Sequence, residues 1–470
     1  MTSLACAATA VPRHLAGPPA WRRLHRAAAG LAFVAAFGAV PAAAAEYVAR
    51  NAAEVAAAAS RARPGDVVLM EGSQWRDQVI EFTGEGAPGK PIVLKPRVPG
   101  SIKLDGSSRI EISGRWLQAE GLRFEGGALD AGKPIVQFRG KRGEASNSRL
   151  TDSAFIRYNP PDPKTRYPWV ALYGQDNRVD HNRFEGMAHE GVTVAVFRKA
   201  KKIDGHQIDH NYFLDRPRGD GNGFETIRVG AGATAYSDSN TRIERNLFER
   251  TDGEVETVSI KSGGNVIREN TFREVAGTIT LRRGSGNTVE NNIFIGNGKA
   301  GTGGIRVTGN DHIVRGNVIQ GVEGLVGGAI SISCGVDKPT DEVEYDPVRR
   351  LQLRGNVIVD SDAPAIKADA LCNDKRNVRP SDVVVEDNVV VGKKSPVMAG
   401  QQGDRWSWKD NEVEGEGESG AALPPGTKRA ARAVTRGSDG VARAALPRGG
   451  TPNVGNALTA ADVGPSWWKK

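Results

Sequence analysis

A six-residue pattern of apolar and polar positions recurs along this chain. It consists of an apolar residue, two variable positions, an asparagine, one variable position and a second apolar residue, and it occurs eight times. The asparagines of the eight copies are Asn182, Asn211, Asn246, Asn270, Asn292, Asn317, Asn356 and Asn388. The four copies from Asn246 to Asn317 are the most closely and most evenly spaced, and the other intervals are longer. A base period of about 22–25 residues with insertions is typical of a solenoid, in which each repeat forms one coil.

The residues around the asparagines favour strands over helices. The repeats are rich in valine and isoleucine, and glycine, asparagine, aspartate and proline separate them. Leucine is too sparse for leucine-rich repeats, which need a helix in every repeat. We therefore expect an all-β fold, a right-handed parallel β-helix whose coils stack about 4.8 Å apart. An asparagine at each corner is expected to adopt the left-handed conformation and to bond the asparagines of neighbouring coils.

The two ends of the chain differ from the repeats. Residues 1–45 combine arginines with the apolar run 27–40 and small residues after it, which predicts a signal peptide. The alanine-rich stretch 51–63 has apolar residues at helical spacing and predicts a short N-terminal helix that caps the solenoid. We expect residues 46–400 to form the β-helix and catalytic domain, and residues 401–470 to be an extension packed on it. Trp406 and Trp408 are expected to contribute to that packing.

The net charge and the apolar runs of the chain limit its possible partners and its cellular location. The formal net charge is +8, and removal of residues 1–45 takes away four arginines and no acidic residue, which leaves +4. The basic balance is therefore weak support for a nucleic-acid partner, and we expect none. The apolar run is too short for a membrane span, and no later stretch reaches that length. We expect a secreted or periplasmic monomer.

Two cysteines, Cys334 and Cys372, remain after the signal segment, and in the oxidising compartments that receive exported proteins such a pair can form a disulfide. Cys334 follows Asn317 at almost the same distance along the chain as Cys372 follows Asn356, with a difference of a single position. Nearly equal places in neighbouring coils would bring the two Cα atoms within the range that a disulfide needs. We therefore predict a disulfide between them, with two free buried thiols as the alternative.

Counting from each asparagine also aligns the charged residues. Asn222 follows Asn211, while Glu254, Glu256 and Lys261 follow Asn246. Arg282 and Arg283 follow Asn270, and Arg306 follows Asn292. Each of these residues lies roughly a third to two thirds of a base period past the asparagine of its own coil, so four successive coils are predicted to place them on one wall. Strict alternation would put Glu254 and Glu256 on one face and Lys261 on the other, so Lys261 joins them only if the strand bends.

Such a wall suits one kind of chemistry. Glu254, Glu256 and the Asn222 amide oxygen are suitable ligands for Ca²⁺. Neutralising a substrate carboxylate makes the proton on the adjacent carbon more acidic. Lys261 is then placed as a general base and Arg282 as the group that stabilises or protonates the leaving oxygen. The predicted reaction is β-elimination from a uronate polymer.

Four motifs resemble the family 6 polysaccharide lyases, the family of alginate lyases and chondroitinase B. They are Asn222-Gly-Phe-Glu-Thr-Ile-Arg228, Glu254-Val-Glu-Thr-Val-Ser-Ile-Lys-Ser262, Gly277-Thr-Ile-Thr-Leu-Arg-Arg-Gly284 and Gly303-Gly-Ile-Arg306. The resemblance implies that Asn222, Glu254 and Glu256 match the calcium ligands, that Lys261 matches the catalytic base and that Arg282 matches the catalytic acid. It also implies that Arg306 grips a substrate carboxylate. Family members usually have histidine after the catalytic arginine, where this chain has Arg283.

The remaining candidates and the alternatives stay open at this stage. Arg283, Arg306, Glu225 and Arg228 are the candidate substrate-binding residues, although Glu225 and Arg228 also suit an internal salt bridge. We expect alginate as substrate. A chondroitin or dermatan sulfate lyase and a non-catalytic β-helix that binds polysaccharide are the alternatives. Glycoside hydrolysis would need two carboxylates as acid and base or nucleophile, and the lysine beside this pair fits metal binding better.

Overall fold

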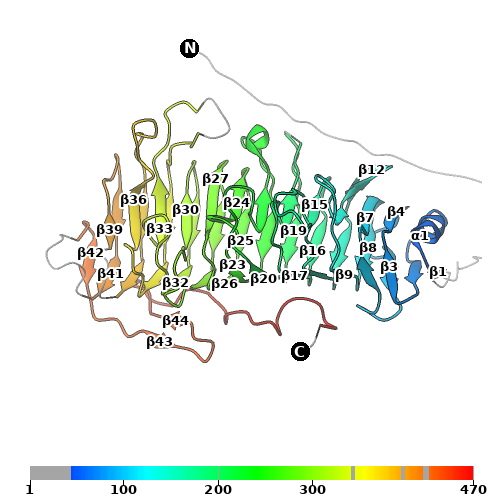
Figure 1. Cartoon of the computed structure of the whole chain (residues 1–470). Helices are drawn as coiled ribbons and strands as arrows, with labels where there is room; N and C mark the ends of the chain where they lie inside the picture. The colour runs from blue at the N-terminus through cyan, green and yellow to red at the C-terminus, as the bar shows by residue number, and fades with distance from the viewer. Residues whose placement is uncertain (1–43, 200, 340–343, 393–396, 416–422, 469–470) are drawn as a thin grey trace, which may run out of the picture. The chain divides into compact units, whose positions relative to one another are not determined.

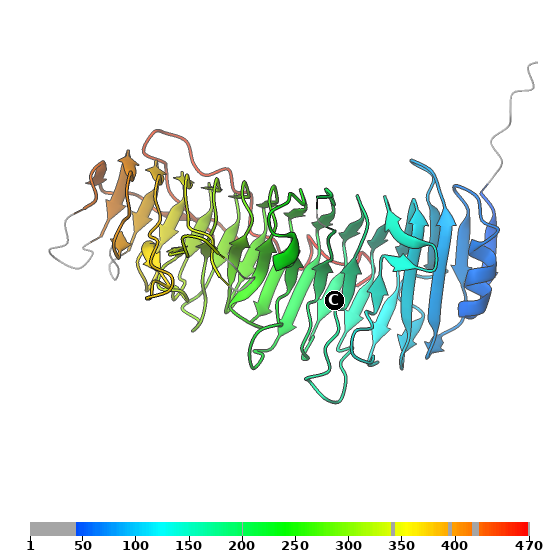
Figure 2. The ribbon, with the colours of Figure 1, turned by 90° about the horizontal axis from the view of Figure 1, so that it is seen from above.

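A computed structural model describes residues 44–468 except 200, 340–343, 393–396 and 416–422. The predicted signal peptide falls almost wholly on residues 1–43, which lie outside the described residues. The described residues between Glu46 and Arg429 form a parallel β-helix, whose strands stack side by side from one coil to the next (Figures 1 and 2). The predicted all-β fold with a short N-terminal helix is confirmed.

Each coil contributes one strand to each of three sheets, which we name A, B and C in the order in which the chain passes through them. In the described residues each sheet has fourteen strands, and nearly all pairs are parallel. Sheet A consists, in stacking order, of β1 (Glu46–Ala49), β2 (Val67–Met70), β5 (Ile92–Pro96), β8 (Leu117–Glu120), β13 (Arg149–Thr151), β16 (Arg178–Asp180), β19 (Gln207–Asp209), β22 (Arg242–Glu244), β25 (Val266–Arg268), β28 (Thr288–Glu290), β31 (Ile313–Arg315), β34 (Gln352–Arg354), β37 (Val384–Glu386) and β40 (Ser407–Lys409).

Sheet B follows sheet A after a tight corner. Its strands are β3 (Gln74–Arg76), β6 (Lys103–Asp105), β9 (Arg123–Glu125), β14 (Ala154–Ile156), β17 (Arg183–Glu185), β20 (Tyr212–Arg216), β23 (Leu247–Thr251), β26 (Thr271–Arg273), β29 (Ile293–Ile295), β32 (Val318–Gln320), β35 (Val357–Val359), β38 (Val389–Val391), β41 (Asn411–Glu414) and β42 (Thr427–Arg429).

Sheet C follows sheet B after loops of variable length. Its strands are β11 (Arg139–Gly140), β12 (Gly143–Ser146), β7 (Arg109–Arg115), β10 (Val136–Gln137), β15 (Val170–Leu172), β18 (Val194–Val196), β21 (Ile227–Val229), β24 (Glu256–Lys261), β27 (Thr278–Arg283), β30 (Ile305–Val307), β33 (Ile330–Ser333), β36 (Ile366–Ala370) and β39 (Met398–Ala399), with β4 (Val79–Glu85) pairing to β7. A short 3-10 helix, η1 (Gly232–Thr234), lies in the loop after β21.

The N-terminal helix α1 spans Ala52–Ala59 and is shorter than the predicted 51–63. The Asn51 side chain caps it by accepting a hydrogen bond from the Glu54 N–H at 2.9 Å. Val55 and Ala58 are buried against the first coils. The helix therefore covers the apolar end of the stack, as expected (Figure 1).

The repeated asparagines form a continuous ladder at the corner between sheets A and B. The Asn270 Oδ1 atom, for example, accepts hydrogen bonds from the Asn246 backbone N–H at 2.9 Å and from Asn246 Nδ2 at 3.0 Å. The prediction that asparagine itself takes the left-handed conformation is wrong. The residue before it does so, for example His210 with φ 52° and Glu269 with φ 55°. The asparagine can then remain extended and turn its amide inward along the stack.

The ladder continues further than the sequence pattern suggested. Asn388 donates to Asn411 Oδ1 at 3.0 and 2.9 Å, and β40 and β41 pair in register with the preceding coil. The stacked coils therefore pass the predicted boundary at residue 401 and reach β42. Trp408 belongs to β40, and Trp406 and Trp408 stack on each other at the end of the core.

Aromatic and histidine side chains fill the interior of the coils. Phenylalanines two positions after the ladder asparagines stack with ring centroids 4.5–5.1 Å apart; they are Phe184, Phe213, Phe248, Phe272 and Phe294. At the corner between sheets C and A, His206 and His312 accept backbone N–H bonds from Asn177 and Asn287, each at 3.1 Å. Burial lowers the pKa of His206 to about 3 and that of His312 to about 4, so both are neutral ladder groups.

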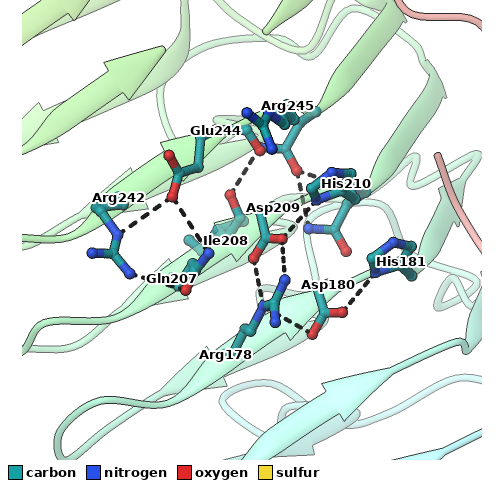
Figure 3. Close-up of polar contacts among 12 residues, drawn as sticks. Arg178, Asp180, His181, Gln207, Ile208, Asp209, His210, Arg242, Glu244 and Arg245 are labelled. Atoms are coloured by element: carbon teal, nitrogen blue, oxygen red, sulfur yellow. Dashed lines mark hydrogen bonds and ion pairs between the residues drawn. The ribbon is translucent and has the colours of Figure 1, made fainter. Parts of the chain in front are cut away.

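Ion pairs between coils cover the outer face of sheet A (Figure 3). The Arg178 guanidinium donates to both carboxylate oxygens of Asp209 on the next coil, at 2.8 and 2.5 Å, and lies 3.4 Å from Asp180. His181 and His210 each pair with the aspartate before them at 2.7 Å, and their rings stack 4.8 Å apart. These residues serve the stacking of coils.

The C-terminal segment runs back along sheet B (Figure 1). β43 (Thr435–Arg436) and β44 (Ala442–Arg443) form an antiparallel pair, and Val441 and Ala442 pack on strands of sheet B. Farther along, the Leu458 N–H bonds Thr271 Oγ1 at 2.9 Å, and Trp467 Nε1 bonds the Asp152 carbonyl at 2.6 Å. These contacts lie on the sheet B side of the stack.

The predicted disulfide is confirmed. Cys334 follows β33 and Cys372 follows β36, and the two cysteines are bonded with their Cα atoms 5.0 Å apart. The described part of the chain contains no helix with the length and apolarity needed to span a bilayer.

Candidate active site

The predicted site residues gather on the outer face of sheet C. Arg228, Ser259, Thr280 and Arg306 occupy one register row on β21, β24, β27 and β30. The alternating residues Ile260 and Leu281 point into the core and are fully buried. Lys261 and Arg282 lie two positions beyond the row, at the ends of neighbouring strands. Counting from the ladder asparagines therefore predicted the correct wall.

A bulge explains how Glu256 and Lys261 share a face. The register between β24 and β27 shifts between Glu256 and Val258, and again between Ile260 and Lys261. An extra residue in one strand reverses the alternation of side chains beyond it. As a result Ser259, three positions after Glu256, donates its hydroxyl to Glu256 Oε2 at 2.6 Å. The bend that the sequence required is therefore present.

Glu254 does not lie on the strand with Glu256, which corrects the sequence-based picture of a carboxylate pair on one strand. It precedes β24, and its Oε2 atom accepts backbone N–H bonds from Gly223 at 2.7 Å and from Phe224 at 3.1 Å. Burial, together with the charges of Glu225 and Glu256, raises the pKa of Glu254 to about 7. The three carboxylates therefore repel one another electrostatically.

Glu256 is held between two arginines. Its Oε1 atom lies 3.6 Å from Arg282 Nε and 3.4 Å from Arg306 Nη1. Burial lowers the pKa of Arg282, against the opposing effects of Tyr345 and Glu256. Two guanidiniums therefore share one carboxylate oxygen.

Tyr345 covers both arginines, although no motif in the sequence pointed to it. Its ring centroid is 4.0 Å from the Arg282 guanidinium carbon and 5.0 Å from that of Arg306, and its hydroxyl accepts a hydrogen bond from Arg306 Nη2 at 2.5 Å. Arg376 approaches the same ring at 4.7 Å. Tyr345 lies in the loop between β33 and β34, whose presence was signalled only by the long interval from Asn317 to Asn356.

Glu225 forms the second charged centre. Its Oε1 atom lies 3.4 Å from Lys261 Nζ and 3.8 Å from Arg228 Nη1, so the internal salt bridge left open by the sequence is present. Its Oε2 atom is buried without a hydrogen-bond partner. Beneath it Arg216 is fully buried and donates to the Gly191 carbonyl at 2.6 Å, and burial lowers its pKa to about 10.

Arg283 makes a different set of contacts from its neighbour Arg282. It donates to the Glu344 carbonyl at 2.8 Å and to the Tyr236 hydroxyl at 3.4 Å. Tyr236 in turn donates to Asp346 at 3.0 Å. Arg283 thus connects the loop after β21 with the loop that carries Tyr345.

The donor set suits a hard cation. Glu225, Glu254 and Glu256 offer carboxylate oxygens, one of them unpartnered, and a cation would relieve the repulsion from Glu225 and Glu256 that adds to burial in raising the pKa of Glu254. Asn222 is exposed beside Gly223, whose N–H binds Glu254. Among the described residues no three acidic, histidine or cysteine side chains are arranged closely enough to hold a metal by themselves.

The comparisons with known proteins agree with this fold and wall. A family model described as chondroitinase B matches residues 49–444. The chain therefore belongs to the chondroitinase B family, polysaccharide lyase family 6, which is a family of lyases. No curated protein matches the chain.

Solved structures of this family superpose on most of the chain. An alginate lyase of family 6, AlyGC, is 32% identical with a TM-score of 0.85 and covers 91% of this chain, which spans 59% of AlyGC. A mannuronic acid specific family 6 lyase from human gut microbiota is 27% identical with a TM-score of 0.75, over 90% of this chain and 96% of its own. The family 6 lyase Pedsa3628 from Pseudopedobacter saltans is 26% identical with a TM-score of 0.75, over 89% and 99%.

Proposed function

We propose that this protein cleaves alginate, a polymer of uronate sugars, by β-elimination. The observation that carries the proposal is the arrangement of Lys261 and Arg282 at the ends of neighbouring strands on one face, with carboxylates and further arginines around them. A base and an acid on the same side of a bound sugar are what this elimination needs.

Each end of the wall has a separate task in the reaction. Arg306 binds the substrate carboxylate, which draws charge off the adjacent carbon, and Arg228, three coils away in the same row, binds another part of the polymer. Lys261 takes the proton from that carbon, and Glu225 at 3.4 Å stabilises the ammonium that forms. The electron pair forms a carbon–carbon double bond as the bond to the glycosidic oxygen breaks. Arg282 donates a proton to that oxygen, a role helped by the burial that lowers its pKa.

Calcium is part of the proposal. Asn222, Glu254 and Glu256 would hold the ion, with Glu225 adjacent. When bound, the cation neutralises the substrate carboxylate and makes the neighbouring proton more acidic. The unpartnered Glu225 oxygen and the raised pKa of Glu254 support a cation at this place.

The choice of alginate is supported by the similarity to AlyGC, an alginate lyase, and to the mannuronic acid specific relative. The second candidate is a sulfated galactosaminoglycan, which the name of the family model favours. We further propose export to the periplasm or the medium, because the Cys334–Cys372 disulfide suits an oxidising compartment and residues 1–45 have the pattern of a signal peptide.

One assay tests the proposal. Unsaturated products absorb ultraviolet light, so the protein is incubated with mannuronate and guluronate blocks, dermatan sulfate and pectate. We expect absorbance to rise with alginate blocks, and Lys261→Ala and Arg282→Ala each to lower the rate at least about a hundredfold. The matched control is Arg245→Ala, an exposed arginine paired with Glu269 far from the wall. Binding without any product would instead make the protein a polysaccharide-binding β-helix.

A further inference from the structure

A hollow lined by arginines lies farther along the same edge of sheet C. We call it the arginine hollow. It has a volume of about 650 Å³, and its walls include Arg349, Arg350, Arg379 and Arg405. Volumes of several hundred cubic ångströms are typical of ligand sites. None of these arginines belongs to the wall described above.

The hollow is connected to the active site through the backbone. The corner after Lys261 and Arg283 continues from coil to coil: Gly264 N–H bonds Ser285 O, Gly286 N–H bonds Asn310 O, and Asp311 N–H bonds Arg349 O. The same corner then passes through residues 381–382 to 404–405. The hollow therefore begins two coils beyond Arg282 and ends four coils beyond it, which is about 10–19 Å at about 4.8 Å for each coil.

The charge of the hollow favours an anion. Its lining contains four arginines and two aspartates, Asp382 and Asp404, while Asp311 and Asp369, which are not part of the lining, act on Arg350 and Arg379. Arg350 is neutralised by Asp311 at 2.5 Å, and Arg405 is neutralised by Asp382.

Two guanidiniums of the hollow are not neutralised in this way. Within the described part of the chain, Arg349 and Arg379 have no carboxylate partner within the 4.0 Å of an ion pair. Arg379 is exposed and Arg349 half-buried, so both are accessible to a ligand.

A further arginine, near Arg379 in the sequence, contacts the tyrosine that covers the catalytic arginine. Arg376 lies 4.7 Å from the Tyr345 ring, which also covers Arg282 and Arg306. Val378, in the same loop, pairs with Gly335, and Cys372 is bonded to Cys334. The loop is therefore fixed to the coil of β33, and Arg376 connects it to the tyrosine that covers the catalytic arginine.

We infer that the arginine hollow is a distal subsite which binds a carboxylate of a long acidic polysaccharide whose cleaved bond lies at Lys261 and Arg282. The inference rests on the proposed function, because it extends the same substrate along the stack. A polymer with one carboxylate on each sugar presents charges at regular intervals, and a track of arginines parallel to the stack can engage several at once. The hollow then favours long chains over short ones by raising the effective concentration of the bound substrate.

The test compares chain lengths. Initial rates are measured over a range of concentrations of polymeric alginate and of an alginate trisaccharide, for the wild type and for Arg349→Ala/Arg379→Ala. We expect the KM for polymer to rise about tenfold with kcat unchanged, and the trisaccharide constants to stay within about twofold. The salt dependence of the polymer KM should also weaken, since two ionic contacts are lost. Arg349→Lys/Arg379→Lys should restore most of the polymer KM.

Controls separate this inference from its premise. The control variant Arg245→Ala/Arg315→Ala removes two exposed arginines on the sheet A side, which are paired with Glu269 and Glu290. It should leave KM and kcat unchanged for both the polymer and the trisaccharide. If the double variant folds poorly, Arg379→Glu replaces it, because it changes a single exposed residue. It should also raise the KM for polymer and leave the trisaccharide constants unchanged.

Different results overturn different proposals. If the wild type does not cleave alginate and the Lys261→Ala variant does not bind it, the proposed function and the subsite are both overturned. A wild type that cleaves alginate, with the double variant unchanged on polymer, overturns the subsite alone. Equal losses on polymer and trisaccharide also overturn it, because they indicate a site for any small anion.

Discussion

Removing Tyr345 should weaken catalysis through the two arginines that it covers. Its hydroxyl accepts the hydrogen bond of Arg306 at 2.5 Å, and a bond to a charged group contributes about 1.5 kcal/mol at the lower end of its usual range. Its ring centroid lies 4.0 Å from the guanidinium carbon of Arg282 and 5.0 Å from that of Arg306, and each cation–π contact adds about 0.5–1 kcal/mol at the lower end of its usual range. Tyr345→Phe should therefore lower kcat/KM about tenfold, and Tyr345→Ala, which loses about 2.5–3.5 kcal/mol, about 70- to 400-fold.

The assay is the initial rate of unsaturated product formation, with thermal unfolding measured beside it. The matched control is Tyr47→Ala, because Tyr47 also carries an arginine on its ring, Arg61 at 5.6 Å, but at the first coil. The reasoning is refuted if Tyr345→Ala keeps kcat/KM within about twofold of the wild type while its unfolding temperature is unchanged. Equal losses in Tyr345→Phe and Tyr345→Ala would assign the whole effect to the hydroxyl.

Three further outcomes are expected. Chelation should abolish activity and added Ca²⁺ restore it, and Glu256→Gln should resemble the chelated enzyme; full activity in excess chelator would remove calcium from the mechanism. In unreduced, denatured protein, Cys334 and Cys372 should resist alkylation as judged by mass spectrometry, whereas two labelled thiols would contradict the disulfide. Asn270→Ala should lower the free energy of unfolding by about 2–4 kcal/mol, because it leaves buried N–H groups of the preceding coil unsatisfied, and a loss below about 0.5 kcal/mol in denaturant titration would show that the ladder contributes little.

The sequence predicted the coil because the coil is a local repeat. Asparagine, the apolar positions and their spacing report the same corner in every turn, so both the fold and the lateral position of Lys261 and Arg282 followed from counting. The pattern could not tell which residue of the corner bears the left-handed conformation, since Asn270 and the residue before it both suit a turn. The ninth copy at Asn411 was missed because a tryptophan, Trp408, takes the place of its first aliphatic residue.

The contacts between loops could not be derived in the same way. Tyr345 reaches Arg282 from the loop after β33, two coils farther along the chain, and its position depends on an insertion whose path the repeat does not describe. Likewise Glu254 was assigned to the strand of Glu256 by spacing alone. Its position is set by the amides of Gly223 and Phe224, and a hydrogen bond to another coil's backbone has no sequence signature when it does not recur from coil to coil, as the bonds of the asparagine ladder do.

The stacking of coils has a consequence for how the protein comes apart. In the three sheets each coil pairs only with its neighbours, so the free energy of opening the stack is largely a sum of interfaces along one dimension, and opening begins at the ends. The C-terminal segment adds contacts along sheet B, for example to Thr271 and Asp152. β24, β27 and β30 lie in the inner part of sheet C, with several coils on either side. Partial opening of the first or last coils therefore leaves the reactive groups assembled. In native-state hydrogen exchange, the backbone amides of β24 and β27 should be among the last to exchange, and they should do so at the free energy of global unfolding.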